Sequence, residues 1–495
     1  MVTSVLPLTL YQANTVRVGE RAAAKSAQVS MYTLMERAGA AVFECLKKMP
    51  CSVNSILICC GGGNNGGDGY IVACLAVAAG IDVEVWHLGD ANQLTGDAAR
   101  ARDTWLAAKG LIGTLQTELP AGVDVVIDAL LGTGLSGMVR DDASELINTI
   151  NQAHKPVIAV DVPSGLCADT GRILGCAIQA DSTVTFIGVK QGLVTGQAPN
   201  VVGKLFFAGL GVGEIFDDQQ QASATSLTDE IIPALLSQRK RTAHKGDHGR
   251  VTCFGGNLGM AGAIRLAAEA CLRTGSGLTA VVTQPDNVMS IVAARPEIMV
   301  QGWQEKAHEI RQQRDWSDVI VLGPGLGTND WGKALYFHLA DCEKKMVVDA
   351  DGLNLLALSP DYKNNRIITP HPGEAARLLA CNIAEIEADR FLAVQRLQQK
   401  YGGVAVLKGA GTLVFDGVCL TVCRAGNPGM ATGGMGDVLS GIIGSLLGQN
   451  LSLSDAAMLG VFIHSKAADL CALEGERGMI ASDLFPYIRQ LVNSR

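Results

Sequence analysis

A glycine-rich loop that directly follows a short apolar strand constrains the fold of this chain more than any other feature. Residues 55–60 read SILICC, and residues 61–69 read GGGNNGGDG. The apolar pattern predicts a helix over residues 70–79 and a second strand over residues 83–86. These segments make one βαβ unit, in which the glycine turn lies at the carboxyl end of a parallel strand. The sequence therefore predicts an α/β protein.

Polar residues inside this loop indicate a ligand site. Gly61, Gly63 and Gly66 match the GxGxxG spacing of a dinucleotide-binding turn, although that match alone has low specificity. Side-chain donors and acceptors are unusual in a simple dinucleotide turn, and here they come from Asn64, Asn65 and Asp68.

Other strand ends in the first half carry acidic or hydroxyl side chains. Strands are predicted at residues 123–127, 156–160 and 183–187; the first leads into Asp128, and the second into Asp161 and Ser164. Ligands of open α/β sheets bind at the carboxyl rim, where these side chains should meet the polar loop. Each acid alone could be an ordinary turn residue, but their joint placement favours a site. Oxygen ligands of this kind also suit a hard cation.

The second half restarts the same pattern. A helix is predicted at residues 262–273, and strands are predicted at residues 251–254, 278–283, 318–322, 346–348, 367–368 and 404–407. These strands lead into loops rich in glycine and polar residues, among them 323–327, 349–352, 369–373 and 408–412.

Two of these loops carry candidate ligand contacts. Residues 408–412 read KGAGT, which is not a Walker loop because no GK[ST] opens a helix. The loop offers backbone N–H groups, one cation and a hydroxyl, which suit the phosphates of a nucleotide. His371 lies between two prolines; a lone histidine is usually structural, but this position favours a ligand contact.

The stretch 427–440, NPGMATGGMGDVLS, precedes an apolar helix predicted at residues 438–447. The unpaired N–H groups and the dipole at a helix start make an anion site. Asp437 should lie in the first helical turn, where it is either an ordinary capping residue or a general base beside a phosphoryl group. The preceding Gly433, Gly434 and Gly436 favour the general base, because a cap does not need them.

Length and composition bound the class of protein. A chain of 495 residues is too long for one ordinary core. We predict domains at 1–217 and 227–495, joined by a polar, low-complexity linker within residues 213–228. The net charge of −8 gives no global attraction to nucleic acid or to an anionic membrane. The short basic run Arg239–Arg241 is interpreted as part of a solvated linker, although Lys245 after it could reach a phosphate.

Cysteine usage and hydropathy indicate a cytoplasmic protein. The 14 cysteines are scattered and form no CxxC pair, which is typical of buried, reduced thiols. The longest apolar run, residues 71–81, is too short to span a bilayer. We expect no membrane partner and no nucleic-acid partner, and we expect a homo-oligomer.

The motifs, taken together, resemble two known families. GGGNNGGDGY, IDALLGTGL and DVPSG resemble the NAD(P)H-hydrate epimerase family. HKGDHG, GPGLG, DADGLN, TPHPGEAARLL, LKGAGT and NPGMATGGMGD resemble the NAD(P)H-hydrate dehydratase family, whose fold is ribokinase-like. The order is that of the fused, bifunctional repair enzymes, and nearly the whole chain is covered. The resemblance implies an α/β architecture with a Rossmann-like, doubly wound N-terminal domain and a ribokinase-like C-terminal domain.

The resemblance also implies roles for individual residues. Reduced nicotinamide cofactors take up water, and the family returns the R and S hydrates to NADH or NADPH. In the epimerase, the hydrate would contact Asn64, Asn65, Gly66, Gly67, Asp68, Gly132, Thr133, Gly134, Leu135, Ser136, Gly137, Met138 and Asp161. A potassium ion (K+) would be held by Asn65, Asp128 and Ser164.

In the dehydratase, the resemblance implies that the S hydrate contacts Ala263, Gly325, His371 and Asp437. The nucleotide would be held by Lys408, Gly409, Ala410, Gly411, Thr412 and Gly436. ADP is the expected phosphoryl donor, together with Mg²⁺, and gives AMP and phosphate. Asp437 and Asp161 are the expected catalytic residues.

The residues alone leave two other functions open. A ribokinase-like small-molecule kinase would use the same base and release a stable phosphorylated product. A nucleotide-sensing or scaffold protein would use the N-terminal half as a binding module without turnover. An intact Asp437 argues against the scaffold.

Overall fold

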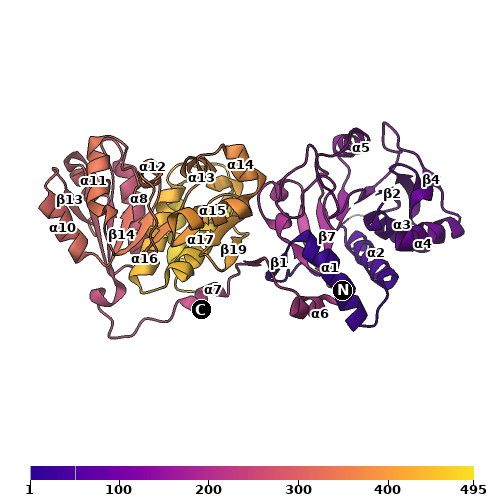
Figure 1. The fold of residues 1–495 in the computed structure, drawn as a ribbon, viewed down its shortest axis with the longest axis horizontal. Helices are drawn as coiled ribbons and strands as arrows, with labels where there is room; N and C mark the ends of the chain where they lie inside the picture. Colours follow the sequence, from indigo (N-terminus) through magenta and orange to yellow (C-terminus); the bar gives the residue numbers. More distant parts are fainter. Residues whose placement is uncertain (1, 51, 495) are drawn as a thin grey trace. The chain divides into compact units, whose positions relative to one another are not determined.

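The computed structural model describes residues 2–50 and 52–494 and divides the chain into two compact units. Unit 1 comprises residues 1–225, and unit 2 comprises residues 226–495. Each unit has its own largely parallel sheet flanked by helices, as Figure 1 shows along the colour gradient from indigo to yellow. The predicted α/β class is confirmed for both halves.

The sheet of unit 1 is parallel and has the strand order β4-β3-β2-β5-β6-β7-β9. Its strands are β2 (Ser55–Cys60), β3 (Asp82–His87), β4 (Ile112–Gly113), β5 (Val125–Ala129), β6 (Val157–Val160), β7 (Ser182–Phe186) and β9 (Lys204–Ala208). The order reverses between β2 and β5, so the chain winds outward in both directions from this pair. Such a switch point opens a crevice at the carboxyl ends of the two strands.

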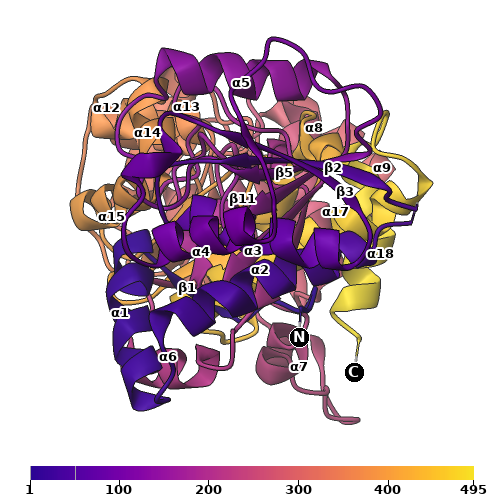
Figure 2. The same ribbon diagram turned by 90° about the vertical axis from the view of Figure 1, so that its right-hand side faces the viewer.

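Helices cover both faces of this sheet. Figure 2 shows α2 (Met31–Lys47), α3 (Asn64–Ala78) and α4 (Gly96–Ala107) below the strands and α5 (Asp141–Gln152) above them. Alternate residues of β2 therefore enter different cores, with Ile56 packed among the lower helices and Leu57 packed against α5. A strand buried on both faces has to be apolar throughout, which explains the continuous run in the sequence.

The helix α3 begins six residues earlier than predicted. Its N-cap is Gly63, so most of the glycine-rich segment is helical rather than a loop. Glycine has low helix propensity, but close packing overrides propensity here. A Cβ at Gly66 would lie 2.0 Å from the carbonyl oxygen of Gly61, and a Cβ at Gly69 would lie 2.8 Å from the sulfur of Cys60. The glycines thus let α3 approach the strand it follows.

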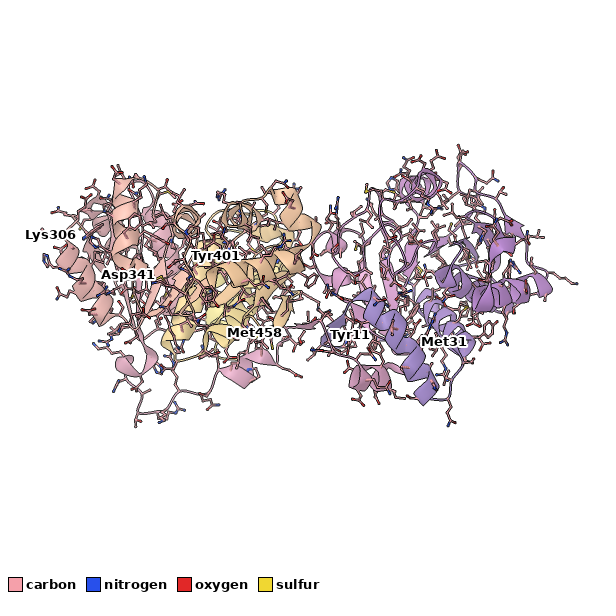
Figure 3. The ribbon with its side chains drawn as sticks, viewed as in Figure 1. Tyr11, Met31, Lys306, Asp341, Tyr401 and Met458 are labelled. Atoms are coloured by element: carbon pink, nitrogen blue, oxygen red, sulfur yellow. The ribbon has the colours of Figure 1, made fainter. Side chains whose placement is uncertain are left out.

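A small ladder completes unit 1. In it β1 (Thr9–Tyr11) pairs parallel with β8 (Val189–Lys190) and antiparallel with β10 (Ala224–Ser226). The linker predicted over residues 213–228 is wrong in its first part, because Gly213–Gln219 form the helix α6. Phe216 of this helix is fully buried, and Tyr11, labelled in Figure 3, packs edge-on against it and hydrogen-bonds to Asp217. One buried aromatic residue therefore converts a polar segment into packed structure. The remaining helix of unit 1, α1, spans Ala13–Ser26.

In unit 2 the strands lie in the order β13-β12-β11-β14-β15-β16-β17-β18-β19. They are β11 (Arg250–Phe254), β12 (Leu278–Thr283), β13 (Met299–Gly302), β14 (Val319–Leu322), β15 (Lys345–Val348), β16 (Arg366–Ile368), β17 (Val404–Leu407), β18 (Thr412–Phe415) and β19 (Leu420–Cys423). Pairing is parallel from β13 to β17 and antiparallel from β17 to β19. The strands predicted from the sequence are all present, with ends shifted by at most one residue.

The helices of unit 2 surround this sheet. They are α7 (Ile231–Leu235), α8 (Ala261–Thr274), α9 (Val288–Ala294), α10 (Ala307–Trp316), α11 (Asp330–Ala340), α12 (Asp351–Leu358), α13 (Pro372–Leu379), α14 (Ile383–Ala388), α15 (Arg390–Tyr401), α16 (Met435–Gly448), α17 (Leu453–Cys471) and α18 (Leu484–Leu491). Tyr401, labelled in Figure 3 at the end of α15, is buried and donates its hydroxyl to the Leu378 carbonyl.

Two apolar helices, α16 and α17, form the centre of the core of unit 2. α16 also packs directly on α8, since a Cβ at Gly441 would lie 2.1 Å from the carbonyl oxygen of Ala267. The segment Leu453–Glu474, which contains α17, is the one stretch of the described residues that is long and apolar enough to cross a membrane. The sequence reading did not single out this segment. Since 67% of its apolar window is buried inside the unit, it is placed as a core helix.

The contact between α8 and α16 gives a stability prediction. Gly441→Ala inserts a methyl group where the backbone of Ala267 already lies, so we expect the free energy of unfolding to fall by about 1–3 kcal/mol. Gly262→Ala is the matched control, since this helical glycine has no atom within 4 Å of an added Cβ. It should gain about 0.5–1 kcal/mol from helix propensity. Urea denaturation measures both variants; equal stability of the two would contradict the packing described.

Candidate active sites

Unit 1 has a cavity of about 820 Å³ at the carboxyl ends of β2 and β5. The site lies where the switch point of the sheet predicts it. Its lining includes most of the residues predicted for the N-terminal site: Asn64, Asn65, Asp68, Gly132, Thr133, Gly134, Leu135, Ser136, Met138 and Asp161. Gly66, Gly67 and Gly137 are not in the lining, and the first two lie buried inside α3.

A buried ion pair occupies one wall of this cavity. The ammonium of Lys190 lies 2.5 Å from Oδ1 of Asp161 and also donates to the Phe186 carbonyl at 3.1 Å. The Thr185 hydroxyl and the Phe186 N–H donate to the same carboxylate oxygen, at 3.1 and 3.2 Å. Oδ2 of Asp161 has no hydrogen-bond partner in the described part of the chain. That oxygen is therefore free to accept a hydrogen bond from a ligand.

The backbone conformation of Asp161 reinforces this reading. Its φ angle is +65°, a left-handed conformation that costs free energy in a residue with a side chain. Strain of this kind persists where surrounding contacts fix the residue, and here Lys190, Thr185 and Phe186 do so.

Other acids in the cavity hold protons near neutral pH. Burial raises the pKa of Glu20 to about 7, against the lowering influence of Lys190. Burial also raises the pKa of Asp68 well above its usual range, and the negative charges of Asp161 and Glu20 raise it further. The cavity thus combines the Lys190–Asp161 pair with carboxyl groups that can donate a proton.

An oxygen-rich cluster adjoins the loop that lines this cavity after β5. Asp128 is fully buried; its Oδ1 accepts from the Ser164 hydroxyl at 2.5 Å, and its Oδ2 accepts from the Ser164 N–H at 2.8 Å. The Ser164 hydroxyl also contacts the backbone of Leu131. Asn65 lies beside the next residue, Gly132, and its Nδ2 is buried without a partner in the described structure. The three residues predicted to hold a cation therefore lie together beside residues 131–132 of the loop that follows β5.

In unit 2 the corresponding rim carries a partly buried cation among carboxylates. The ammonium of Lys408 lies 2.9 Å from Oδ1 of Asp349 and 3.8 Å from Oε2 of Glu374. Asp349 is almost fully buried, and its Oδ2 accepts from the buried Ser440 hydroxyl at 2.7 Å. These contacts raise the pKa of Lys408 above its usual value, although burial opposes them. The lysine stays charged at any physiological pH.

Asp437 lies in the first turn of α16, as predicted, and faces this group. Burial and the charge of Asp349 together raise its pKa to about 7, against the lowering influence of Lys408. The N-cap of this helix is Gly434, so Asp437 does not occupy the capping position itself. A Cβ at Gly436 would lie 3.1 Å from the Lys408 ammonium, which explains why the residue before Asp437 is glycine. The result is a carboxylate poised to exchange a proton at neutral pH.

Two histidines border this group and differ in role. The imidazole of His371 caps α13: its Nδ1 accepts from the Gly373 N–H at 3.0 Å, while the residue is half exposed. His464 on α17 is buried, its Nε2 has no partner in the described structure, and burial lowers its pKa to about 4. His464 is therefore neutral at physiological pH.

The remaining residues predicted for the second site lie at neighbouring strand ends. Gly325 follows β14 with φ +58°, and a Cβ there would lie 3.2 Å from Cβ of Ala263 in the first turn of α8. The loop Lys408–Thr412 is the turn between β17 and β18, and the Thr412 hydroxyl donates to the Gly409 carbonyl at 2.9 Å. The cation and backbone groups expected for phosphate binding are thus held in a closed turn.

Sequence reasoning missed several residues of both sites. Lys190 is the one charged residue in the stretch 183–194, and that contrast was the available signal. Glu20 had no signal, since it lies on an amphipathic helix with many other charged residues. Asp349 and Glu374 were within quoted motifs, but their contacts with Lys408 join strand ends far apart in the sequence.

Comparisons with known proteins support the two-part organisation. The family model described as YjeF-related protein N-terminus matches residues 31–192, and the model described as NAD(P)H-hydrate dehydratase matches residues 251–490. A bifunctional NAD(P)H-hydrate repair enzyme, Nnr, from Vibrio cholerae is 50% identical over 99% of both chains. The enzyme of that name from Escherichia coli is 48% identical over 99% of this chain and 95% of its own length.

Solved structures resemble the C-terminal half. A hypothetical protein from Streptococcus mutans is 29% identical with a TM-score of 0.50, covering 54% of this chain and 98% of its own. A ribokinase-like superfamily protein from Enterococcus faecalis is 30% identical with a TM-score of 0.50, covering 54% of this chain and 94% of its own. The predicted ribokinase-like fold of the C-terminal half is confirmed.

The Lys190–Asp161 ion pair in unit 1 predicts how the stability of the protein depends on pH. Lys190→Met removes the charge that lowers the pKa values of Glu20 and Asp68 and leaves Asp161 without its cation. Breaking a buried pair costs about 3–5 kcal/mol. An acid whose pKa is raised in the folded state lowers the free energy of unfolding as pH rises. The loss of stability caused by Lys190→Met should therefore be larger at pH 8 than at pH 5.

Urea denaturation at both pH values measures this effect. Lys48→Ala is the control, because its pair with Glu44 is exposed and should contribute less than about 1 kcal/mol. An equal loss for Lys190→Met at pH 5 and pH 8 would show that the acids of the cavity do not respond to Lys190.

Proposed function

Because the chain belongs to the family of bifunctional NAD(P)H-hydrate repair enzymes, we propose that its two units divide the two activities of that family. The enzyme is an NAD(P)H-hydrate epimerase and an NAD(P)H-hydrate dehydratase. We place the epimerase in unit 1, around the cavity with Asp161, and the dehydratase in unit 2, around Asp437. The kinase and scaffold functions left open by the residues are set aside by this membership.

In the epimerase, the proposed substrate site is the cavity of unit 1. Exchange of R and S forms requires the ring hydroxyl to leave and water to return on the other face. The leaving hydroxyl needs a proton, and Glu20 with a pKa of about 7 can donate one. Oδ2 of Asp161 can accept the proton of the returning water, while Lys190 holds its other oxygen.

We further propose that K+ occupies the oxygen cluster under this cavity. The donors fit the ion, since Asp128, Ser164 and Asn65 offer only oxygen ligands once the Asn65 amide is turned. A hard cation prefers such ligands. The ion would fix the loop that follows β5, which supplies a large part of the cavity wall.

In the dehydratase, Asp437 is the proposed general base. It takes the proton of the ring hydroxyl, and the hydroxyl oxygen attacks the terminal phosphorus of the donor nucleotide. The C–O bond then breaks and phosphate leaves, pushed by the lone pair of the ring nitrogen, and loss of a proton from the adjacent ring carbon to water restores the dihydronicotinamide. Hydroxide is a poor leaving group, whereas phosphate is a good one. The observation that best supports this role is the pKa of about 7 for Asp437, whose side chain lies among carboxylates and near the Lys408 ammonium.

The donor proposed for this step is ADP, which gives AMP and phosphate. Its phosphates would contact Lys408–Thr412 and the N–H groups at the start of α16. Mg²⁺ would arrive with these phosphates, because that ion is usually bound through them and a few waters. This fits the described residues, in which no group of three or more His, Cys, Asp or Glu side chains is arranged to hold a metal ion.

A cytoplasmic location is proposed on the chemistry of the thiols. Every cysteine in the described part of the chain is free, and the sulfurs of Cys253 and Cys271 lie 3.9 Å apart. Burial raises the pKa of Cys271, which keeps it protonated and unreactive. Thiols of this type suit a reducing compartment.

The K+ site gives a test that does not depend on turnover. Potassium chloride should raise the melting temperature of the wild type relative to choline chloride, because a ligand that binds only the folded state stabilises it. Asn65→Ala should lose this stabilisation together with the K+ dependence of epimerisation. Asn64→Ala, a neighbour outside the cation set, should keep both. An unchanged K+ effect in Asn65→Ala would remove the proposed site.

The general base gives the main activity prediction. Asp437→Asn should lower the ADP-dependent rate of reduced-cofactor recovery from the S hydrate by about 10²–10⁴-fold. Binding of ADP should change little, because the side chain acts on the hydroxyl. In the wild type, activity should fall as pH drops through about 7, since the base must be ionised.

Asp455→Asn serves as the matched control, because Asp455 is a first-turn acid of another helix in the same unit. It should keep full activity and lose at most some stability. If Asp437→Asn retained a rate near that of the control, Asp437 would be an ordinary first-turn residue.

A further inference from the structure

Unit 2 contains a second cavity that the proposed reaction does not use. Its volume is about 620 Å³, within the range of small-molecule sites. Arginines dominate its wall and come from separate segments: Arg239 and Arg241 from the loop after α7 (Figure 1), Arg273, Arg295, and Arg489 from α18.

The cavity lies at the opposite end of the core helices from Asp437. Gln449, the C-cap of α16, and Gly275, the C-cap of α8, both line it. Asp437 is in the first turn of α16, so the two places are separated by roughly 18 Å along the axis, at about 1.5 Å per residue. The cavity is therefore not an extension of the dehydratase site.

Three of the arginines have structural contacts. Arg239 donates to the Gly275 carbonyl and to Gln449, at the ends of the two helices. Arg273 and Arg295 share the buried carboxylate of Glu269, so one negative charge faces two positive ones. This sharing leaves an excess of positive charge on one side of the cavity.

The other two arginines are not used by the fold. Neither Arg241 nor Arg489 has a side-chain hydrogen bond or ion pair within the described residues, and both are exposed. Thr274, which also lines the cavity, is 2% exposed, and its hydroxyl has no partner in that part of the chain. The lining holds one acidic residue, Glu297, against five arginines.

We propose that this cavity binds a small anion with two or more phosphoryl groups. Guanidinium groups pair with phosphate through two parallel hydrogen bonds. Arg241 and Arg489 come from different segments, so a ligand that contacts both has to present anionic oxygens in two directions. The same chemistry is offered by free pyrophosphate and by the diphosphate of a nucleotide. The protein as a whole is negatively charged, which makes such a concentration of cations a local feature.

The test is calorimetric titration of the full-length protein with inorganic pyrophosphate and, separately, with ADP. The wild type should bind pyrophosphate in a manner that weakens with salt. Arg241→Ala/Arg489→Ala should weaken this binding at least tenfold. Lys240→Ala, a neighbouring cation outside the lining, should bind as the wild type does.

The two ligands distinguish the source of the phosphates. If the cavity takes nucleotides, ADP should show one more site in the wild type than in the double variant; if it takes free polyphosphate, only the pyrophosphate isotherm should change. Either result supports the site, and unchanged isotherms for both ligands overturn it. The double variant should keep the wild-type melting temperature and the dehydratase rate measured without pyrophosphate, so failure here leaves the proposed function untouched.

Discussion

The ion pair between Lys408 and Asp349 organises the site of the C-terminal unit. It joins the ends of β15 and β17, which are far apart in the sequence, and it holds a positive charge among Asp349, Glu374 and Asp437. Without that cation, fewer of these carboxylates could stay ionised so close together in a buried site. With it, one of them, Asp437, keeps a pKa near neutrality and can act as a base.

The N-terminal unit solves the same physical problem separately. Lys190 holds Asp161 at the end of a parallel strand, and nearby Glu20 retains a proton at neutral pH. Both units therefore place one lysine against one acid at the carboxyl rim of a sheet, where open α/β folds bind ligands. Each pair also leaves a further acid free for proton transfer.

Much of this arrangement was predictable from the sequence. Continuous apolar strands that end in glycine and polar residues fixed the α/β class, and the first-turn position of Asp437 followed from the glycines before it. The start of α3 at Asn64 was not predictable, because glycine argues against a helix unless close packing requires it. Lys190, Glu20 and the arginine cavity depend on contacts between distant segments, which periodicity does not reveal.

The central claim is that Asp437 lets the ring hydroxyl attack a phosphoryl group instead of leaving directly. Labelling that hydroxyl with oxygen-18 tests the claim. The S hydrate is prepared with the label and converted with unlabelled ADP in unlabelled water by the Asp161→Asn variant, in which the proposed epimerase cannot exchange the hydroxyl with water. The released phosphate is analysed by mass spectrometry. The account predicts one labelled oxygen in each phosphate released per cofactor recovered. Label found in water, with none in phosphate, would contradict it.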